Sequence, residues 1–288
     1  MGPVPHVSFL TDYGLADGFV AACHGVLLRR GVTALDITHL IDPGDVRRGA
    51  AVLAQTVRYL PVSVHLAVVD PGVGTSRRGV VLVTPGGLLV GPDNGLLAPA
   101  AAVLGGVTAA VALAARPGVP ATFHGRDVFA PAAAELAAGT PPTALGRPVD
   151  PAEIVLLPPV LARVSSPEVR ADRADAEVEA EVVLVDRFGN VQLAATGDLL
   201  AHVGLVPGQR AEVRGAAMAA DGPLDLPVGV TFGSVEPGEL VLYVDSAGMA
   251  AFAVRDGDAA SRLGLAPGDV VSLRPRRARS DRGSWTSR

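Results

Sequence analysis

The chain has 288 residues, of which 49% are hydrophobic but only 4% are aromatic, and its formal net charge is -5. This length fits one large domain or two modest ones, with a core built mostly from Ala, Val and Leu. All 24 basic residues are Arg, which excludes Schiff-base catalysis by lysine and the lysine-dependent phosphate-binding loop.

The first half of the chain alternates short apolar runs with helical patterns. We expect strands over residues 7–10, 34–38 and 63–69, and helices over residues 17–29 and 45–59. This alternation is typical of βαβ units. It predicts an α/β fold whose mostly parallel sheet carries helices on both faces.

Two short motifs in the first half of the chain also predict local structure. Gly86-Gly87 is predicted to form the turn of a hairpin between strands at 80–83 and 88–91. Asp127 is expected to be the N-cap of a helix that runs through Ala138.

The second half indicates a smaller, antiparallel β domain with a barrel-like form. Prolines crowd residues 141–167, so we place a domain boundary near residue 165. We therefore expect domains at 1–165 and 166–274, followed by a disordered, Arg-rich tail at 275–288. Short β-patterned runs separated by Gly and Pro support the β domain; they are residues 182–185, 209–213, 240–244, 251–254 and 270–273.

Composition also bears on location and partners. The single Cys23 lies in an apolar helical pattern and is expected to be a small core residue. The start of the chain lacks a charged and apolar leader, and no apolar run approaches the roughly 20 residues that span a bilayer. We expect a soluble cytoplasmic protein with neither a nucleic-acid nor a membrane partner.

The segment from Asp70 to Arg77 is the strongest chemical signal. It follows a strand, at the end where open α/β sheets bind their ligands. Gly72 and Gly74 make the intervening loop flexible, so the carboxylate and the guanidinium are expected to pair around a small polar molecule. A buried water is one candidate.

Other candidates are weaker when taken alone. Asp12 follows the first strand and suits ribose hydroxyls, although an Asp there is often only a turn residue. His124 lies in a loop before a helix and could be a base or a hydrogen-bond donor. The other five histidines show no partner at metal-ligand spacing, so no metal centre is predicted.

Taken together, seven segments resemble the S-adenosylmethionine hydroxide adenosyltransferases, a family that also contains the S-adenosylmethionine-dependent fluorinase and chlorinase. They occur in the family's order between about residues 6 and 273. The segments are Phe9–Gly14, Asp36–His39, Val68–Thr75 with Arg77, Gly91–Leu96, Phe123–Asp127, Asp186–Asn190 and Asp245–Gly248.

The resemblance implies a reaction and a set of roles. Hydrolytic members carry an Asp, Arg and His set that holds water, and Asp70, Arg77 and His124 fall on those positions. The halogenating members lack this set, and the fluorinase has a loop inserted near it. The resemblance therefore implies hydrolysis of S-adenosyl-L-methionine to adenosine and L-methionine at ribose C5′, with His124 as the expected proton acceptor and no cofactor.

The same resemblance implies substrate contacts and an assembly. Asp12 falls on the position that binds the ribose hydroxyls, and Asn190 on one near the adenine. Asp186 and Ser246 fall on positions that hold the methionine amine and carboxylate. Family members are homotrimers whose sites lie between the N-terminal domain of one subunit and the C-terminal domain of its neighbour.

Two residues depart from the family pattern. Gly44 stands where relatives often place an aromatic residue, and Ala247 stands where the fluorinase has an Arg. Both bear on substrate affinity more than on reaction type.

Three alternatives remain at this point. One is a metal-dependent hydrolase that uses Asp12, Asp70, His124 and Asp127. Another is a non-enzymatic sensor of adenosine or S-adenosylmethionine. The third is a peptide-binding module, because residues 257–271 resemble a turn found in PDZ domains.

Overall fold

The computed structural model describes residues 6–61, 64–114, 118–165, 176–215 and 222–276. The chain divides into two compact units, Met1–Pro158 and Pro159–Arg288, called here the N-terminal and the C-terminal unit. The boundary predicted near residue 165 lies a few residues beyond this division.

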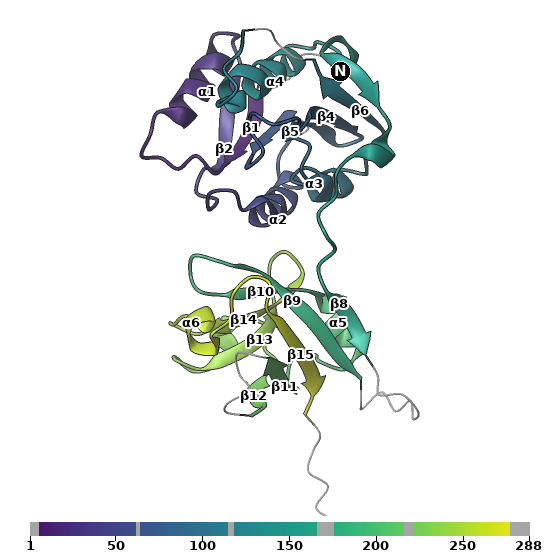
Figure 1. Ribbon diagram of the computed structural model, residues 1–288. Helices are drawn as coiled ribbons and strands as arrows, with labels where there is room; N and C mark the ends of the chain where they lie inside the picture. The colour runs from purple at the N-terminus through teal and green to yellow at the C-terminus, as the bar shows by residue number, and fades with distance from the viewer. Residues whose placement is uncertain (1–5, 62–63, 115–117, 166–175, 216–221, 277–288) are drawn as a thin grey trace, which may run out of the picture. The chain divides into compact units, whose positions relative to one another are not determined.

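A seven-stranded mixed sheet organises the N-terminal unit (Figure 1). Its strands are β1 (His6–Thr11), β2 (Thr33–Thr38), β3 (Val64–Val68), β4 (Gly79–Thr84), β5 (Gly87–Pro92), β6 (Ala109–Leu113) and β7 (Gly146–Val149). The spatial order is β2-β1-β3-β5-β4-β6-β7. The first four strands in this order pair in parallel, as the alternation predicts, and the remaining pairs are antiparallel.

The antiparallel half begins at the predicted hairpin. Strands β4 and β5 pair from Thr84 and Gly87 outward, so Pro85 and Gly86 form the connection. The turn therefore begins one residue earlier than the Gly86-Gly87 pair indicated.

Helices cover both faces of this sheet, as expected. They are α1 (Phe19–Leu28), α2 (Val46–Val57), α3 (Ala98–Val103) and α4 (Ala130–Ala137), with a π-helical turn at Gly125–Phe129 and short 3-10 turns at Pro142–Ala144 and Pro151–Glu153. Figure 1 shows α1 and α4 on one face and α2 and α3 on the other. The two cores are built from alternate residues of the same strands, because successive side chains of a strand point to opposite faces. In β1, Phe9 packs in the core of α1 and α4, and Leu10 packs in that of α2 and α3.

The C-terminal unit is an antiparallel sheet that nearly closes into a barrel. Its strands are β8 (Ala162–Ser165), β9 (Glu177–Val185), β10 (Val191–Thr196), β11 (Arg210–Gly215), β12 (Leu224–Pro227), β13 (Leu240–Val244), β14 (Met249–Val254) and β15 (Val270–Pro275). The order is β12-β11-β15-β9-β10-β14-β13, with β8 paired to β9. An isolated bridge between Val228 and Leu242 links the two ends of this order. The predicted β domain is confirmed.

Short helical segments complete this unit: α5 (Gly197–His202), α6 (Ala259–Leu263) and a 3-10 turn at Phe232–Ser234. The segment that resembles a PDZ turn forms α6, which ends at Gly264 in the left-handed conformation, and then leads into β15. Residues 277–288 of the predicted tail lie outside the described residues, and residue 275 still belongs to β15. In the part of the chain that the structure describes, no helix is both long and apolar enough to cross a bilayer.

Candidate active site

Two carboxylates follow adjacent parallel strands of the N-terminal unit. Thr11 at the end of β1 pairs with Val68 at the end of β3, and Asp12 and Asp70 follow within two residues. The Asp12 Oδ2 accepts a hydrogen bond of 2.8 Å from the Gly44 amide. Gly44 has a φ of +77°, a left-handed conformation that favours glycine. The carboxyl end of the parallel strands therefore presents both acids, as expected from the sequence.

Arg77 joins Asp70 and His124 into one group. Its Nε donates to Asp70 Oδ1 at 3.0 Å, and its Nη2 donates to Asp70 Oδ2. The same Nη2 donates to His124 Nδ1 at 3.1 Å. The guanidinium carbon lies 5.3 Å from the centre of the Phe129 ring, an arrangement that also favours the cation. The three residues predicted to hold water thus converge in the structure.

The loop between Asp70 and Arg77 is held by its own hydrogen bonds. The Val73 amide donates to the Asp70 carbonyl, and the Thr75 hydroxyl donates to the Gly72 carbonyl at 2.7 Å. Gly74 has a φ of +79°. Gly74 therefore permits the tight turn, and these hydrogen bonds hold the loop in it.

His124 has a defined tautomer in this arrangement. An arginine side chain has only donors, so Nδ1 of His124 must be an unprotonated acceptor. The neutral imidazole then carries its proton on Nε2. That nitrogen can donate a hydrogen bond but cannot accept a proton.

The helix after His124 differs from the prediction. Asp127 is not an N-cap, because the π-helical turn begins at Gly125 and His124 precedes it. The Asp127 carboxylate instead pairs with the neighbouring Arg126 at 2.7 Å. A π-helical turn is often found at functional sites, and here it follows directly after His124.

A small cavity of about 70 Å³ lies beside this group. Its lining is Asp12, Tyr13, Val68, Asp70, Val73, Thr122, Phe123, His124 and Gly125. Its walls combine apolar side chains with two carboxylates and an imidazole, and it has room for at least one ordered water. Arg77 holds its two partners beside this cavity.

Burial and charge act in opposite directions on Asp70. Burial raises the pKa of the Asp70 carboxyl above its ordinary value, and the Arg77 guanidinium offsets part of that rise. Burial also raises the pKa of the nearby Tyr13 phenol. Tyr13 therefore stays protonated at neutral pH.

Tyr13 and Phe123 are site residues that chemical reasoning from the sequence did not single out. Their rings meet edge to face, with centroids 5.6 Å apart. Both residues lie within segments that carry the family resemblance, Phe9–Gly14 and Phe123–Asp127. Membership of these segments is the feature of the sequence that could have indicated them.

The Gly91–Leu96 motif serves the site indirectly. The Asn94 side-chain amide donates to the Val69 carbonyl at 2.8 Å, directly before Asp70. Asp93 accepts from Arg78 and from the Val155 amide. These contacts fix the backbone that carries Asp70.

The remaining predicted site residues lie in the C-terminal unit. Asp186 Oδ1 accepts from the Phe188 and Asn190 amides, and its Oδ2 accepts from the Asn190 side chain at 2.8 Å. Ser246 is exposed in the turn between β13 and β14. Asp186 therefore shapes its own loop, which is the turn-forming role that its sequence also permits.

Asn190 lines an aromatic cavity of about 390 Å³ in this unit. The other lining residues are Phe188, Phe232, Val254, Asp256 and Gly257. Phe188 is 76% exposed and Phe232 is 54% exposed. Two largely exposed aromatic rings beside an amide suit a planar, nitrogen-rich ring.

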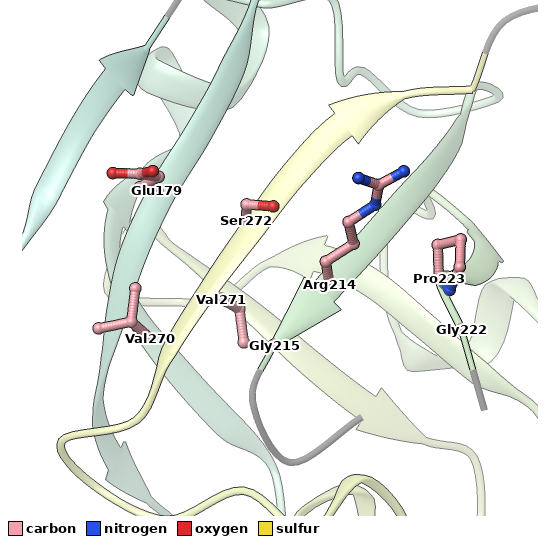
Figure 2. Close-up of a pocket in the computed structure, with 8 residues that line it drawn as sticks. All are labelled: Glu179, Arg214, Gly215, Gly222, Pro223, Val270, Val271 and Ser272. Atoms are coloured by element: carbon pink, nitrogen blue, oxygen red, sulfur yellow. The ribbon is translucent and has the colours of Figure 1, made fainter. Parts of the chain in front are cut away.

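Another cavity, of about 420 Å³, lies over β9, β11 and β15 (Figure 2). Its charged side chains are already paired: Glu179 with Arg163, and Arg214 with Glu212. Figure 2 shows no His, Cys or Asp among the labelled lining residues. Among its described lining residues, the Ser272 hydroxyl therefore has no histidine or unpaired carboxylate beside it to act as a base.

One prediction about histidines is wrong. His24 and His39, expected to have no ligand-type partner, both meet Asp36. Elsewhere, the four residues of the metal-hydrolase alternative are not grouped at metal-binding distances in the part of the chain that the structure describes, whereas His24, Asp36 and His39 are. The geometry does not favour that alternative.

Comparisons with known proteins agree with this geometry. The sequence matches the SAM hydroxide adenosyltransferase N-terminal domain over residues 7–146 and the C-terminal domain over residues 180–272. It is 56% identical to a (R)-S-adenosyl-L-methionine hydrolase of Salinispora tropica, over 95% of this chain and 99% of that protein. A fluorinase of Actinopolyspora mzabensis is 28% identical, over 85% of this chain and 88% of that protein.

A solved structure has the same fold. The crystal structure of an uncharacterized conserved protein from Thermotoga maritima aligns with a TM-score of 0.82 and 33% identity. The alignment covers 93% of this chain and 99% of that one.

Gly125 offers a test of the packing around His124. A Cβ added at Gly125 would overlap the Tyr13 hydroxyl and lie 2.9 Å from Tyr13 Cζ. We expect Gly125→Ala to lower the free energy of unfolding by about 1–3 kcal/mol, the usual cost of overpacking. Urea unfolding followed by circular dichroism measures it.

The matched control is Gly25→Ala in α1, where an added Cβ meets no atom within 4 Å. That variant should be as stable as the wild type or more stable by up to about 1 kcal/mol, because alanine favours helix. Equal stability of the two variants would contradict the packing described.

Proposed function

Because this chain belongs to the SAM hydroxide adenosyltransferase family, we propose that it hydrolyses S-adenosyl-L-methionine to adenosine and L-methionine. The Asp70, Arg77 and His124 group beside a small cavity with room for water is the observation that carries this proposal. The residue roles below are part of it.

The reaction is a displacement at ribose C5′. The oxygen of water forms a bond to C5′ while the bond from C5′ to sulfur breaks, and the bonding electrons leave with sulfur. Methionine leaves as a neutral thioether, so the leaving group needs no proton. The difficulty lies in the nucleophile, because free water has a pKa of about 15.7.

The hydrogen bonds favour Asp70 as the proton acceptor. Each carboxylate oxygen keeps a lone pair after bonding to Arg77, and burial makes this carboxylate a better base than an exposed one. His124, expected from the resemblance to accept the proton, instead has Nε2–H to donate. It would hold the water oxygen and stabilise its hydroxide character, while Arg77 keeps Asp70 and His124 in place.

The substrate contacts follow the matched positions. Asp12 keeps Oδ1 for the ribose hydroxyls, since Oδ2 is bonded to Gly44. The aromatic cavity around Asn190 suits adenine, and Asp186 and Ser246 would bind the methionine part. Fixing both ends of the substrate aligns oxygen, C5′ and sulfur, which contributes several kcal/mol to catalysis.

Gly44 and Ala247 affect affinity in this proposal. Gly44 adopts a left-handed conformation and presents no ring to the ligand. Ala247 donates its amide to Asp245 Oδ1 at 2.8 Å and has no charge to offer a carboxylate. We expect weaker substrate binding than in relatives with an aromatic residue and an arginine at these positions.

Water, rather than a halide, is the proposed nucleophile. The chain has the Asp, Arg and His set and shows no insertion after Thr75. The proposal requires no metal or organic cofactor for the reaction and no nucleic-acid partner. A cytoplasmic location remains part of the proposal.

A homotrimer is the proposed assembly, in which the N-terminal unit of one subunit and the C-terminal unit of its neighbour share a substrate. The N-terminal unit exposes several large apolar side chains, including Leu15, Leu35 and Leu40, at 67%, 48% and 64%. Such surfaces favour association between chains.

Hydrolysis in ¹⁸O-water tests the reaction itself. We expect methionine and adenosine in equal amounts, with the heavy oxygen at the 5′ position of adenosine, because water attacks C5′. Chromatography with mass spectrometry measures both products. Unlabelled adenosine would contradict the mechanism, and binding without any product would favour the sensor alternative.

Variants of His124 and Asp70 test whether His124 acts as a hydrogen-bond donor and Asp70 as the base. His124→Ala and Asp70→Asn should each lower kcat at least about tenfold, since a positioned acid or base contributes about 10² to 10⁴. His124→Gln should be clearly faster than His124→Ala, because the glutamine amide supplies a donor but no base. The wild-type rate should fall as the pH drops through the raised pKa of Asp70, because the carboxyl is then protonated.

The control is His202→Ala, at an exposed position in the C-terminal unit, which should leave kcat unchanged. Equal kcat values for His124→Gln and His124→Ala would contradict the donor role and indicate that His124 is the base.

Mixing inactive variants tests the shared site. One variant is Asp70→Asn, and the other is the double variant Phe188→Ala, Asn190→Ala. After unfolding and refolding an equal mixture, about a quarter of the sites of a cyclic trimer combine two intact halves. Steady-state kinetics should then show about that share of wild-type activity, whereas either variant refolded alone stays inactive. No recovery would contradict a site shared between subunits.

A further inference from the structure

Three side chains from separate places in the N-terminal unit meet outside the proposed active site. His24 comes from α1, Asp36 from β2, and His39 follows β2 directly. Asp36 Oδ1 lies 2.9 Å from His24 Nε2 and 3.1 Å from His39 Nε2. The three ligand-type atoms all lie within 4.8 Å of one another.

The imidazole of His39 is oriented by a second hydrogen bond. Its Nδ1 lies 2.8 Å from the Thr11 hydroxyl, and both residues are buried. In the tautomer whose Nδ1–H donates to this hydroxyl, the lone pair stands on Nε2. Histidines that bind metals are held in this way by a partner on the opposite nitrogen.

The Nε2 of His39 has no hydrogen-bond partner although its side chain is only 3% exposed. It faces the Asp36 carboxylate in a geometry that is not a hydrogen bond. In that tautomer the Nε2 lone pair faces the Asp36 carboxylate, and a cation between the two atoms would remove their repulsion. The arrangement therefore points to a missing positive charge.

We propose that His24 Nε2, Asp36 Oδ1 and His39 Nε2 bind one divalent transition-metal ion, Zn²⁺ being the best match. Two imidazoles and a carboxylate form a ligand set that zinc favours, with a fourth position for water. Metal–ligand bonds of about 2.0–2.2 Å place tetrahedral ligands about 3.3–3.6 Å apart, so the ion would need the side chains to move outward by a few tenths of an ångström. Ca²⁺ and Mg²⁺ prefer sites made only of oxygen ligands.

The exposure of the site suits entry of an ion. The His24 and Asp36 side chains are 28% and 42% exposed, while His39 is buried. The Phe9 ring packs against both imidazoles. Its centroid lies 5.8 Å from that of the His24 ring and 4.8 Å from that of the His39 ring. The ion would thus be bound in an open surface site with an apolar floor.

The position indicates a structural role. The ion would join α1 to the edge strand β2 and hold His39 against Thr11. The His39 carbonyl also accepts from the Gly14 amide at 2.8 Å. Asp12 and Tyr13 lie between these two contacts, so the ion would stabilise the loop that carries the proposed ribose-binding residue.

Metal titration of the full-length, untagged protein tests this site. After dialysis against a chelator, we expect calorimetry to detect one Zn²⁺ per chain, and Co²⁺ to give the visible absorption bands of a nitrogen- and oxygen-coordinated ion. His24→Gln and Asp36→Asn should each weaken Zn²⁺ binding at least about 10- to 100-fold, because even the loss of an outer-shell partner has that effect. Zn²⁺ should raise the thermal midpoint of the wild type more than that of either variant.

The control is His202→Gln, which should bind Zn²⁺ as the wild type does. Both ligand variants change exposed or half-exposed side chains, and circular dichroism checks that they fold. Less than stoichiometric binding by the wild type, or unchanged affinity in both variants, would overturn the proposal and leave a hydrogen-bonded trio without an ion. Zn²⁺ binding is measured without substrate, so its result does not depend on whether the chain hydrolyses S-adenosyl-L-methionine.

Discussion

The bridge that Arg77 makes between Asp70 and His124 determines the chemistry available to the N-terminal unit. A guanidinium has several donors in one rigid plane and stays charged at all relevant pH values. It can therefore satisfy a buried carboxylate with two hydrogen bonds and still donate to an imidazole. A lysine ammonium, a compact charge on a flexible stem, would not impose this geometry. Because the bridge occupies Nδ1, it also decides which proton His124 carries.

The sheet places these groups before any ligand arrives. The register that pairs Thr11 with Val68 brings the carboxyl ends of β1 and β3 together, and Asn94 fixes the Val69 carbonyl next to Asp70. The turn stabilised by the Thr75 hydroxyl returns the chain so that Arg77 reaches Asp70. Much of the motif that carries the family resemblance is thus concerned with backbone position, and only a few side chains face the cavity.

Sequence periodicity was sufficient for the parallel half of the sheet, the β domain and the pairing of Asp70 with Arg77, because each depends on local pattern or short separation. His124 is 47 residues from Arg77, so only the resemblance indicated it. Its tautomer required coordinates. The N-cap predicted at Asp127 was wrong because a π-helical turn starts earlier and Arg126 takes the carboxylate. The meeting of His24 with Asp36 depends on α1 packing beside β2, which spacing does not show.

The two groups of this unit can be compared by where their positive charge comes from. In the first, a carboxylate and an imidazole are bridged by Arg77, a cation that is part of the chain. In the second, Asp36 faces two imidazoles, those of His24 and His39. A covalently attached cation leaves the neighbouring cavity free for water and cannot be exchanged. An ion bound by His24, Asp36 and His39 would be exchangeable and would use the free lone pair of His39. The source of the positive charge thus distinguishes the two groups: one suits hydrolysis and the other suits a metal ion.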